Sequence, residues 1–71
     1  MRRSLKNVRQ SEAVQAFVSL GGIERRGKGS HKVVNLNRMN LSIPQGVLKE
    51  GLLRRLIQVS GFTVDDFLRE L

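Results

Sequence analysis

The sequence predicts one α+β domain, with its elements in the order helix, strand, strand hairpin, helix and short helix. Two patterns of apolar residues support this prediction. Apolar side chains recur at helical spacing in 11–20 and again in 53–60, whereas they alternate with polar side chains from Lys32 to Ile43, as in half-buried strands. A chain of 71 residues has enough apolar surface for one core, so residues 1–71 are predicted to form a single domain.

The first helix is expected to begin at Ser11 and to end before Gly21 and Gly22. A serine hydroxyl can cap the free N–H groups of a helix start, Glu12 complements the positive end of the helix dipole, and glycine commonly follows the last helical residue. Residues 1–10 are polar and basic with little periodicity. They predict a flexible or frayed basic arm, or an extension of the first helix.

Three strands are expected between the first two helices. Residues 23–26 are expected to form a short strand. The loop 27–29 follows, where glycines permit backbone conformations that other residues avoid. The next two strands form a hairpin with its tip at Asn37 and Arg38. Pro44 ends the second of them because proline cannot donate a hydrogen bond to a strand ladder.

The C-terminal part of the chain predicts a second helix and a short third one. The inward face of the second helix carries Leu53, Leu56, Ile57 and Ser60. Gly51 lies near the start of this helix and Gly61 just beyond its end. Thr63 is expected to cap the last helix, with Asp65 and Asp66 at its positive N-terminal end. The inward residues of that helix are Phe67, Leu68 and Leu71.

The charge of the chain favours a polyanionic partner. The 13 Lys and Arg residues against 6 Asp and Glu residues give a formal charge of +7, which concentrates phosphate-bearing molecules near the protein. The chain has no cysteine, which excludes disulfides and thiolate metal sites and fits a reducing cytoplasm. It also has no apolar run long enough for an export signal or a membrane span. We therefore expect a cytoplasmic protein that does not contact a membrane.

His31 is the one histidine of the chain and the strongest candidate for acid–base chemistry. If Val34 and Leu36 face the core, strand alternation places His31 on the opposite face or at its edge, where a substrate can reach it. Imidazole can both accept and donate a proton near neutral pH. The residues expected to bind a phosphate backbone beside it are Arg25, Arg26, Lys28, Gly29, Ser30 and Lys32.

A histidine among cations is suited to RNA cleavage without a metal. The imidazole of His31 would remove the ribose 2′-hydroxyl proton or protonate the departing 5′-oxygen, while Arg26 or Lys28 would stabilise the charge that develops on the phosphate. One histidine, no cysteine and scattered carboxylates offer no set of metal ligands, so we expect no metal and no other cofactor.

Each of these residues also has a purely structural interpretation. His31 is then an ordinary histidine at a strand edge, and the lysines and arginines form a solvated surface. Gly27 and Gly29 then serve a tight turn, whether or not the loop meets phosphate. Ser30 is more simply a hydroxyl that bonds the backbone than a nucleophile, since the sequence offers no partners for a serine triad.

Several landmarks of the sequence occur together and in order. They are the run 26–31 with its Gly-Ser-His triplet, a strand hairpin ending at Pro44, the segment 49–57 with Gly-Leu-Leu, the pair 61–62 and the closing segment 65–68. In this combination the chain resembles the HicA family of toxins from Ser11 to Leu71. Two positions differ from the family pattern: Gly22 stands where members usually have an aromatic residue, and Gln45 lies near where many have a second histidine.

The resemblance implies a fold similar to the double-stranded-RNA-binding domain, α-β-β-β-α, with a three-stranded antiparallel sheet and helices on one face. It also implies an endoribonuclease that cleaves messenger RNA, an mRNA interferase of a toxin–antitoxin system. The catalytic histidine of the family corresponds to His31, and a HicB-type antitoxin would neutralise the toxin by covering this site. Two other classes stay open, namely a non-catalytic RNA-binding module that uses the basic loop and hairpin, and a domain that binds an acidic protein.

Overall fold

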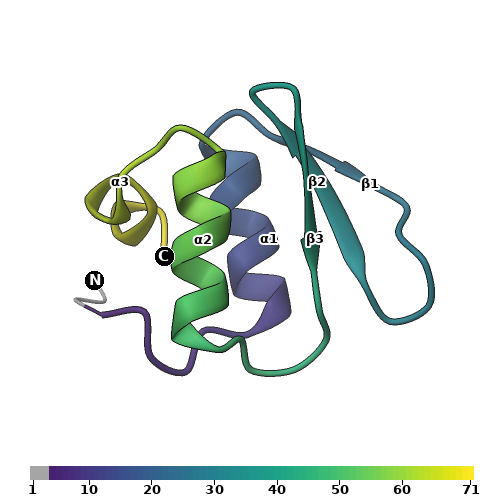
Figure 1. The fold of residues 1–71 in the computed structure, drawn as a ribbon, viewed down its shortest axis with the longest axis horizontal. Coiled ribbons are helices and arrows are strands. Elements are labelled where there is room, and N and C mark those ends of the chain that lie inside the picture. The colour runs from purple at the N-terminus through teal and green to yellow at the C-terminus, as the bar shows by residue number, and fades with distance from the viewer. Residues whose placement is uncertain (1–3) are drawn as a thin grey trace.

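Three helices and three strands make up residues 4–71, the part of the chain that the computed structural model describes (Figure 1). The elements are, in order, α1 (Gln10–Ser19), β1 (Ile23–Arg25), β2 (Lys32–Leu36), β3 (Met39–Ile43), α2 (Glu50–Val59) and α3 (Val64–Arg69). The strands form an antiparallel sheet in the order β1-β2-β3. The predicted α+β fold with the order α-β-β-β-α, followed by a short helix, is therefore confirmed.

The β2–β3 hairpin forms where the apolar alternation predicts it. Val34 lies opposite Leu41 in the strand register, and both side chains are buried. Asn37 and Arg38 form the two-residue tip with φ values of 51° and 68°, as in the type I′ turn that suits the twist of a hairpin. The Asn37 side chain donates a hydrogen bond to the Ser60 carbonyl oxygen at 2.7 Å, which ties the tip to the end of α2.

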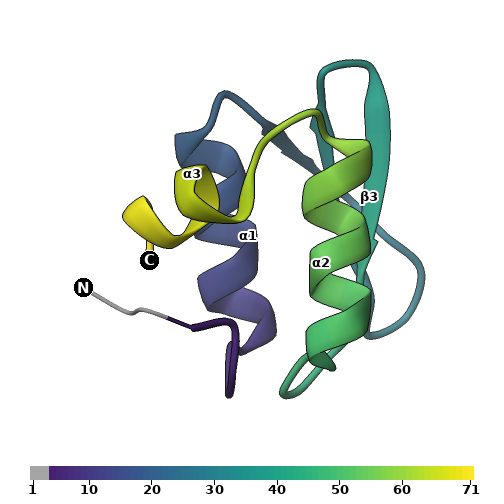
Figure 2. The same ribbon diagram turned by 60° about the vertical axis from the view of Figure 1, so that its left-hand side comes forward.

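The helices lie on one side of the sheet and enclose the core with it (Figure 2). The largest buried apolar side chains of this core include Phe17 of α1, Val34 of β2, Leu41 and Ile43 of β3, Leu53 and Ile57 of α2, and Phe67 of α3. The ring centroids of Phe17 and Phe67 lie 4.9 Å apart with the planes tilted by 53°, which is a favourable aromatic arrangement. The helices therefore cover one face of the sheet and leave its other face open.

Gly22 lets α1 approach β2 closely. A Cβ atom at this position would lie 2.5 Å from Val34 Cγ1 and 2.8 Å from the Phe17 carbonyl oxygen. Those distances leave no room for a side chain in a close-packed interior. This position is therefore closed to a large side chain, and α1 and β2 pack directly on each other.

The segment before α1 belongs to the core, so the prediction of a flexible or frayed basic arm over residues 1–10 is wrong for residues 4–9, whereas Gln10 extends the first helix, which is the alternative prediction. Leu5 and Val8 are 2% and 0% exposed, respectively. Two apolar residues among polar ones are too few to show a period, which is why the sequence does not reveal this contact. Residues 1–3, the remainder of the predicted arm, lie outside the described residues.

Backbone pairing holds this segment against the loop before α2. The Leu48 N–H donates to the Val8 carbonyl oxygen at 2.8 Å, and Arg9 forms an isolated antiparallel bridge with Val47. The partners lie far apart in the sequence, so neither stretch alone predicts the pairing. The start of α1 is thereby attached to the loop that follows β3.

The first helix begins before the predicted cap. Arg9 is the N-cap residue of α1, and its N–H donates to the Glu12 carboxylate at 3.0 Å. Glu12 therefore lies in the first turn, at the positive end of the helix dipole, as expected. Ser11, predicted to be the cap, lies inside the first turn and is exposed. Arg9 pairs with Val47 in the loop before α2, and the helix begins directly after it. A long-range contact therefore accompanies this helix start, and the local capping residues do not indicate it.

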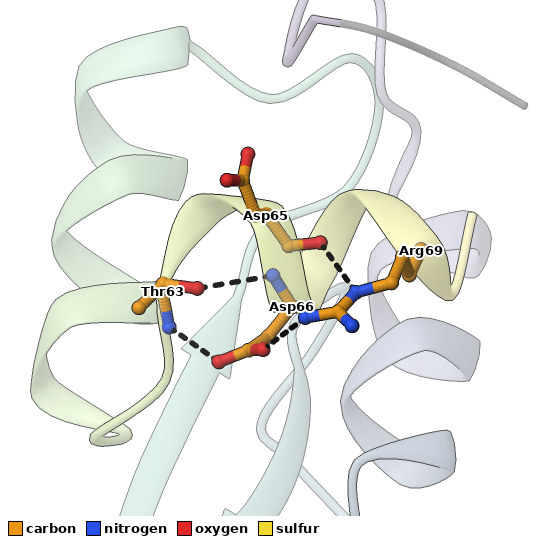
Figure 3. A network of polar contacts seen from close by, with 4 residues as sticks. All are labelled: Thr63, Asp65, Asp66 and Arg69. Atoms are coloured by element: carbon orange, nitrogen blue, oxygen red, sulfur yellow. Dashed lines mark hydrogen bonds and ion pairs between the residues drawn. The ribbon is translucent and has the colours of Figure 1, made fainter.

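A reciprocal pair of hydrogen bonds begins α3 as predicted (Figure 3). Thr63 is the N-cap: its Oγ1 accepts the Asp66 N–H at 3.1 Å, and the Asp66 carboxylate accepts the Thr63 N–H at 3.0 Å. Arg69 forms an ion pair with the same carboxylate at 2.7 Å. The hydrogen bond from the Thr63 N–H is the main reason why the pKa of Asp66 lies below its ordinary value.

Candidate active site

The loop between β1 and β2 carries His31 to the start of β2 through two glycines. A Cβ atom at Gly27 would lie 2.9 Å from the His31 carbonyl carbon and 3.3 Å from Lys32 Cα, so the two backbones pass too closely for a side chain. Gly29 has a φ of +59°, and the His31 N–H donates to the Lys28 carbonyl oxygen at 3.1 Å across this turn. The expected tight turn is confirmed, and it fixes the backbone from which the imidazole projects.

A surface hollow opens beside this turn. It is lined by Glu24, Arg25, Arg26, Gly27, Gly29, His31 and Lys32. Of the residues predicted to bind phosphate, Arg25, Arg26, Gly29 and Lys32 share this hollow with His31, whereas Lys28 and Ser30 do not line it. The last two lie exposed in the adjoining turn. The fold thus brings the histidine and three of the predicted cations to one place.

Glu24 lines the hollow although the sequence does not single it out. Its carboxylate lies 3.9 Å from Lys32 Nζ, and both side chains are 48% exposed. This ion pair partly neutralises Lys32, so the charge of Arg25 or Arg26 is more available to a phosphate. The strand register is the signal that identifies the pair, since Glu24 lies opposite Val34 and therefore on the same face of the sheet as Lys32.

His31 directly precedes β2, at the end of the sheet. Val34 and Leu36 are buried, as predicted, so Val33, directly before Val34, faces the other way. Arg25 lies opposite Val33 in the register and shares this face of the sheet with it. The β1–β2 loop lies at the end of the sheet opposite the hairpin tip (Figure 1).

The His31 side chain is exposed and available to a ligand. Within residues 4–71, no hydrogen bond or ion pair joins its imidazole to another group. Gln45 lines a separate hollow together with Arg9, Gln10, Ser11 and Gly46. The position of the imidazole is therefore set by the backbone that carries it.

Gln10 reaches the candidate site from the first turn of α1. Its Nε2 donates to the Ser30 carbonyl oxygen at 2.7 Å and to the Ile43 carbonyl oxygen at 2.9 Å. Sequence reasoning missed this residue because it lay in the predicted arm. Its partners are 20 and 33 residues away along the chain, and no local pattern indicates hydrogen bonds over such separations.

The chemistry of the hollow is that of cations beside one acid–base group. Arginine guanidinium groups bind phosphate oxygens through charge-assisted hydrogen bonds, and an imidazole can exchange a proton with a group held next to it. Residues 4–71 contain no cluster of three or more side chains able to hold a metal ion. Over the same residues, no helix has the length and apolar character needed to cross a membrane.

Comparisons of the chain with protein-family models, with curated proteins and with solved structures find no match.

Proposed function

We propose that this chain is a cytoplasmic endoribonuclease of the HicA type, the toxin of a toxin–antitoxin pair, and that it cleaves messenger RNA without a metal. The observation that carries the proposal is the hollow in which His31 meets Arg25, Arg26 and Lys32. A proton-transfer group beside several cations is what cleavage of a phosphodiester through the ribose 2′-hydroxyl requires.

The chemistry can be written as one displacement. The His31 imidazole removes the proton of the ribose 2′-hydroxyl, and this oxygen attacks the adjacent phosphorus as the bond to the 5′-oxygen breaks. Water or a lysine protonates the departing 5′-oxygen. Arg26 lines the hollow and is better placed than Lys28 to stabilise the charge on the phosphate oxygens. The products are a 2′,3′-cyclic phosphate and a 5′-hydroxyl.

The mechanism requires RNA, because DNA lacks the 2′-hydroxyl that attacks the phosphorus. The chain has no Tyr and no Trp, so stacking of bases on aromatic side chains contributes little to binding. The affinity is therefore expected to come from phosphate contacts and to fall as the salt concentration rises.

A HicB-type antitoxin is the proposed protein partner. The formal charge of +7 and the exposed side chains of Arg25, Arg26 and Lys28 present a basic surface around the hollow. An acidic surface on the partner would complement it and cover His31. A domain that bound only an acidic protein would show no salt-sensitive RNA binding, which separates that alternative from this proposal.

A non-catalytic RNA-binding module is the second candidate function. The observation in its favour is that the His31 imidazole has no orienting partner within residues 4–71. General bases are usually oriented by a third group. Both candidates predict salt-sensitive RNA binding, so cleavage is the property that distinguishes them.

Incubation with labelled RNA in excess EDTA tests the proposal. The parent protein should cleave the RNA and His31→Ala should not, while both should bind it within about twofold, because one neutral side chain contributes little to polyelectrolyte affinity. Gln58→Ala, a change at an exposed position of α2, is the control and should cleave like the parent.

A copy of the same RNA with 2′-deoxy residues at the cut sites should stay intact, since it lacks the nucleophile. Salt-dependent binding without cleavage by the folded parent would leave the RNA-binding module as the function. Equal cleavage by the parent and His31→Ala would also overturn the proposal.

A further inference from the structure

Gln10 connects the turn that carries His31 to the rest of the fold. The two N–H groups of its side-chain amide are donated to carbonyl oxygens of Ser30, at 2.7 Å, and of Ile43, at 2.9 Å. Ser30 directly precedes His31, and Ile43 lies opposite Lys32 in the sheet. The Gln10 side chain thus holds two backbone positions next to His31. One is Ser30, which precedes it, and the other is Ile43, which pairs with Lys32.

The backbone of Gln10 is itself held firmly. Its N–H donates to the Gly46 carbonyl oxygen at 3.0 Å, and the preceding residue, Arg9, bridges to Val47. The amide group therefore projects from a helix start that is paired with the loop after β3. By contrast, Ser30 and His31 are exposed, and the hydrogen bond from the His31 N–H to Lys28 is local to the turn.

The chemistry at this point requires an amide. Two carbonyl oxygens need two donors, and the glutamine NH₂ group supplies both from one planar nitrogen. A glutamate has the same shape, yet its ionised carboxylate is only an acceptor and would face two carbonyl oxygens without a hydrogen to share.

We propose that Gln10 is a positioning residue for His31. Its side chain fixes the position of the backbone at Ser30 and His31 relative to the hollow. The placement of His31 by Gln10 is inferred from the two hydrogen bonds. The effect of Gln10 on catalysis rests on the proposed ribonuclease function. A shift of the segment moves the imidazole relative to the phosphate, to which proton transfer is sensitive.

The test compares Gln10→Glu with Gln15→Glu. Gln15 lies exposed in the same helix, so both variants change the net charge by the same single unit. His31 is the one histidine of the chain, so its imidazole signals in an NMR spectrum need no separation from others. In Gln10→Glu these signals should shift, and hydrogen exchange of the His31 N–H should accelerate by about tenfold.

Cleavage gives a second readout. In Gln10→Glu, kcat should fall by about tenfold or more while KM stays within about twofold, because the loss affects orientation rather than phosphate binding. Gln15→Glu should match the parent in both quantities. If the Glu variant does not keep the parental circular dichroism spectrum, the pair Gln10→Ala and Gln15→Ala gives the same comparison without an added charge.

The proposal would be overturned if the Gln10 and Gln15 variants gave the same His31 imidazole signals and the same hydrogen-exchange rate of the His31 N–H, whether or not the parent cleaves RNA. If these signals move in the Gln10 variants and the parent does not cleave RNA, the positioning of His31 stands and the ribonuclease function fails. Loss of cleavage without any change at His31 would also overturn the positioning role.

Discussion

The start of α3 and the start of β2 both gather polar side chains, and they do so in different ways. Thr63, Asp66 and Arg69 satisfy one another through short hydrogen bonds and an ion pair. His31 and Arg26 instead project into an open hollow, where the imidazole has no partner within residues 4–71. Helix formation explains the first set, whereas the second set is the one on which the proposed RNA binding depends.

The comparison also shows how glycine serves the two regions. The capping residues of α3 need no special backbone, because their side chains close the helix start. The β1–β2 loop is instead shaped by the backbone at Gly27 and Gly29, and the Gln10 side chain holds it from α1. Changes at these glycines should therefore damage the hollow, whereas changes to the side chains of Thr63 and Asp66 should damage the cap.

The largest effect is expected from Gly27→Ala. The added Cβ meets the His31 carbonyl group and the backbone of Lys32, so the strand start has to move. A displacement of the reacting group by about 1 Å can lower the rate about 100-fold. Single-turnover cleavage of the labelled RNA measures this loss.

Gly51→Ala is the control for this change. A Cβ atom at Gly51 meets nothing within 4 Å, and the residue lies in α2, where alanine is favoured over glycine. This variant should cleave like the parent and be slightly more stable. A parental cleavage rate for Gly27→Ala would show that the geometry of the turn is not important for the site.

A smaller effect is expected from removing one arginine in each region. Arg26→Ala should weaken RNA binding and reduce the slope of log affinity against log salt by about 1, because one phosphate contact is lost. Arg69→Ala removes the same charge from the capping network, so it should lower the melting temperature and change the salt slope less. Equal salt slopes for the two variants would mean that net charge, rather than the hollow, binds the RNA.

The smallest effect is expected from the titration of Asp66. Hydrogen bonds from Thr63, with Arg69 nearby, hold the pKa of this carboxyl below its ordinary value of 3.8. A folded-state pKa that is lowered contributes stability above the unfolded value and loses it as the pH falls through the folded value. The parent should therefore exceed Asp66→Asn in melting temperature at neutral pH, and the difference should shrink as the pH falls below 3.8.

Asp65→Asn is the matched control for this titration. The carboxylate of Asp65 takes no part in the network of Figure 3, where its backbone carbonyl oxygen accepts from Arg69 Nε at 3.4 Å. The melting temperature of Asp65→Asn should change with pH in the same way as that of the parent. A difference between the parent and Asp66→Asn that did not change with pH would contradict the role of the ionised carboxylate.

Local patterns were sufficient for most of the fold. The apolar face of α2, the alternation that includes Val34 and Leu41, and the cap at Thr63 each depend on residues close together in the chain, and all three are confirmed. The turn at Gly27 and Gly29 is of the same kind, since glycine is required by the local backbone.

Long-range contacts account for what the sequence did not predict. Leu5 and Val8 are buried because their segment pairs with the loop before α2, far along the chain. Gln10 reaches Ser30 for the same reason. Glu24 was missed because its ion pair depends on the strand register, which apolar alternation alone does not define.

The ends of the RNA fragments distinguish attack by the ribose 2′-hydroxyl from attack by water. We expect mass spectrometry of RNA cut by the parent protein in EDTA to find a 2′,3′-cyclic phosphate on one fragment and a 5′-hydroxyl on the other. Neither product should form with His31→Ala. Fragments with a 5′-phosphate and a 3′-hydroxyl, or no cleavage by the folded parent, would contradict attack by the 2′-hydroxyl with His31 as the acid–base group.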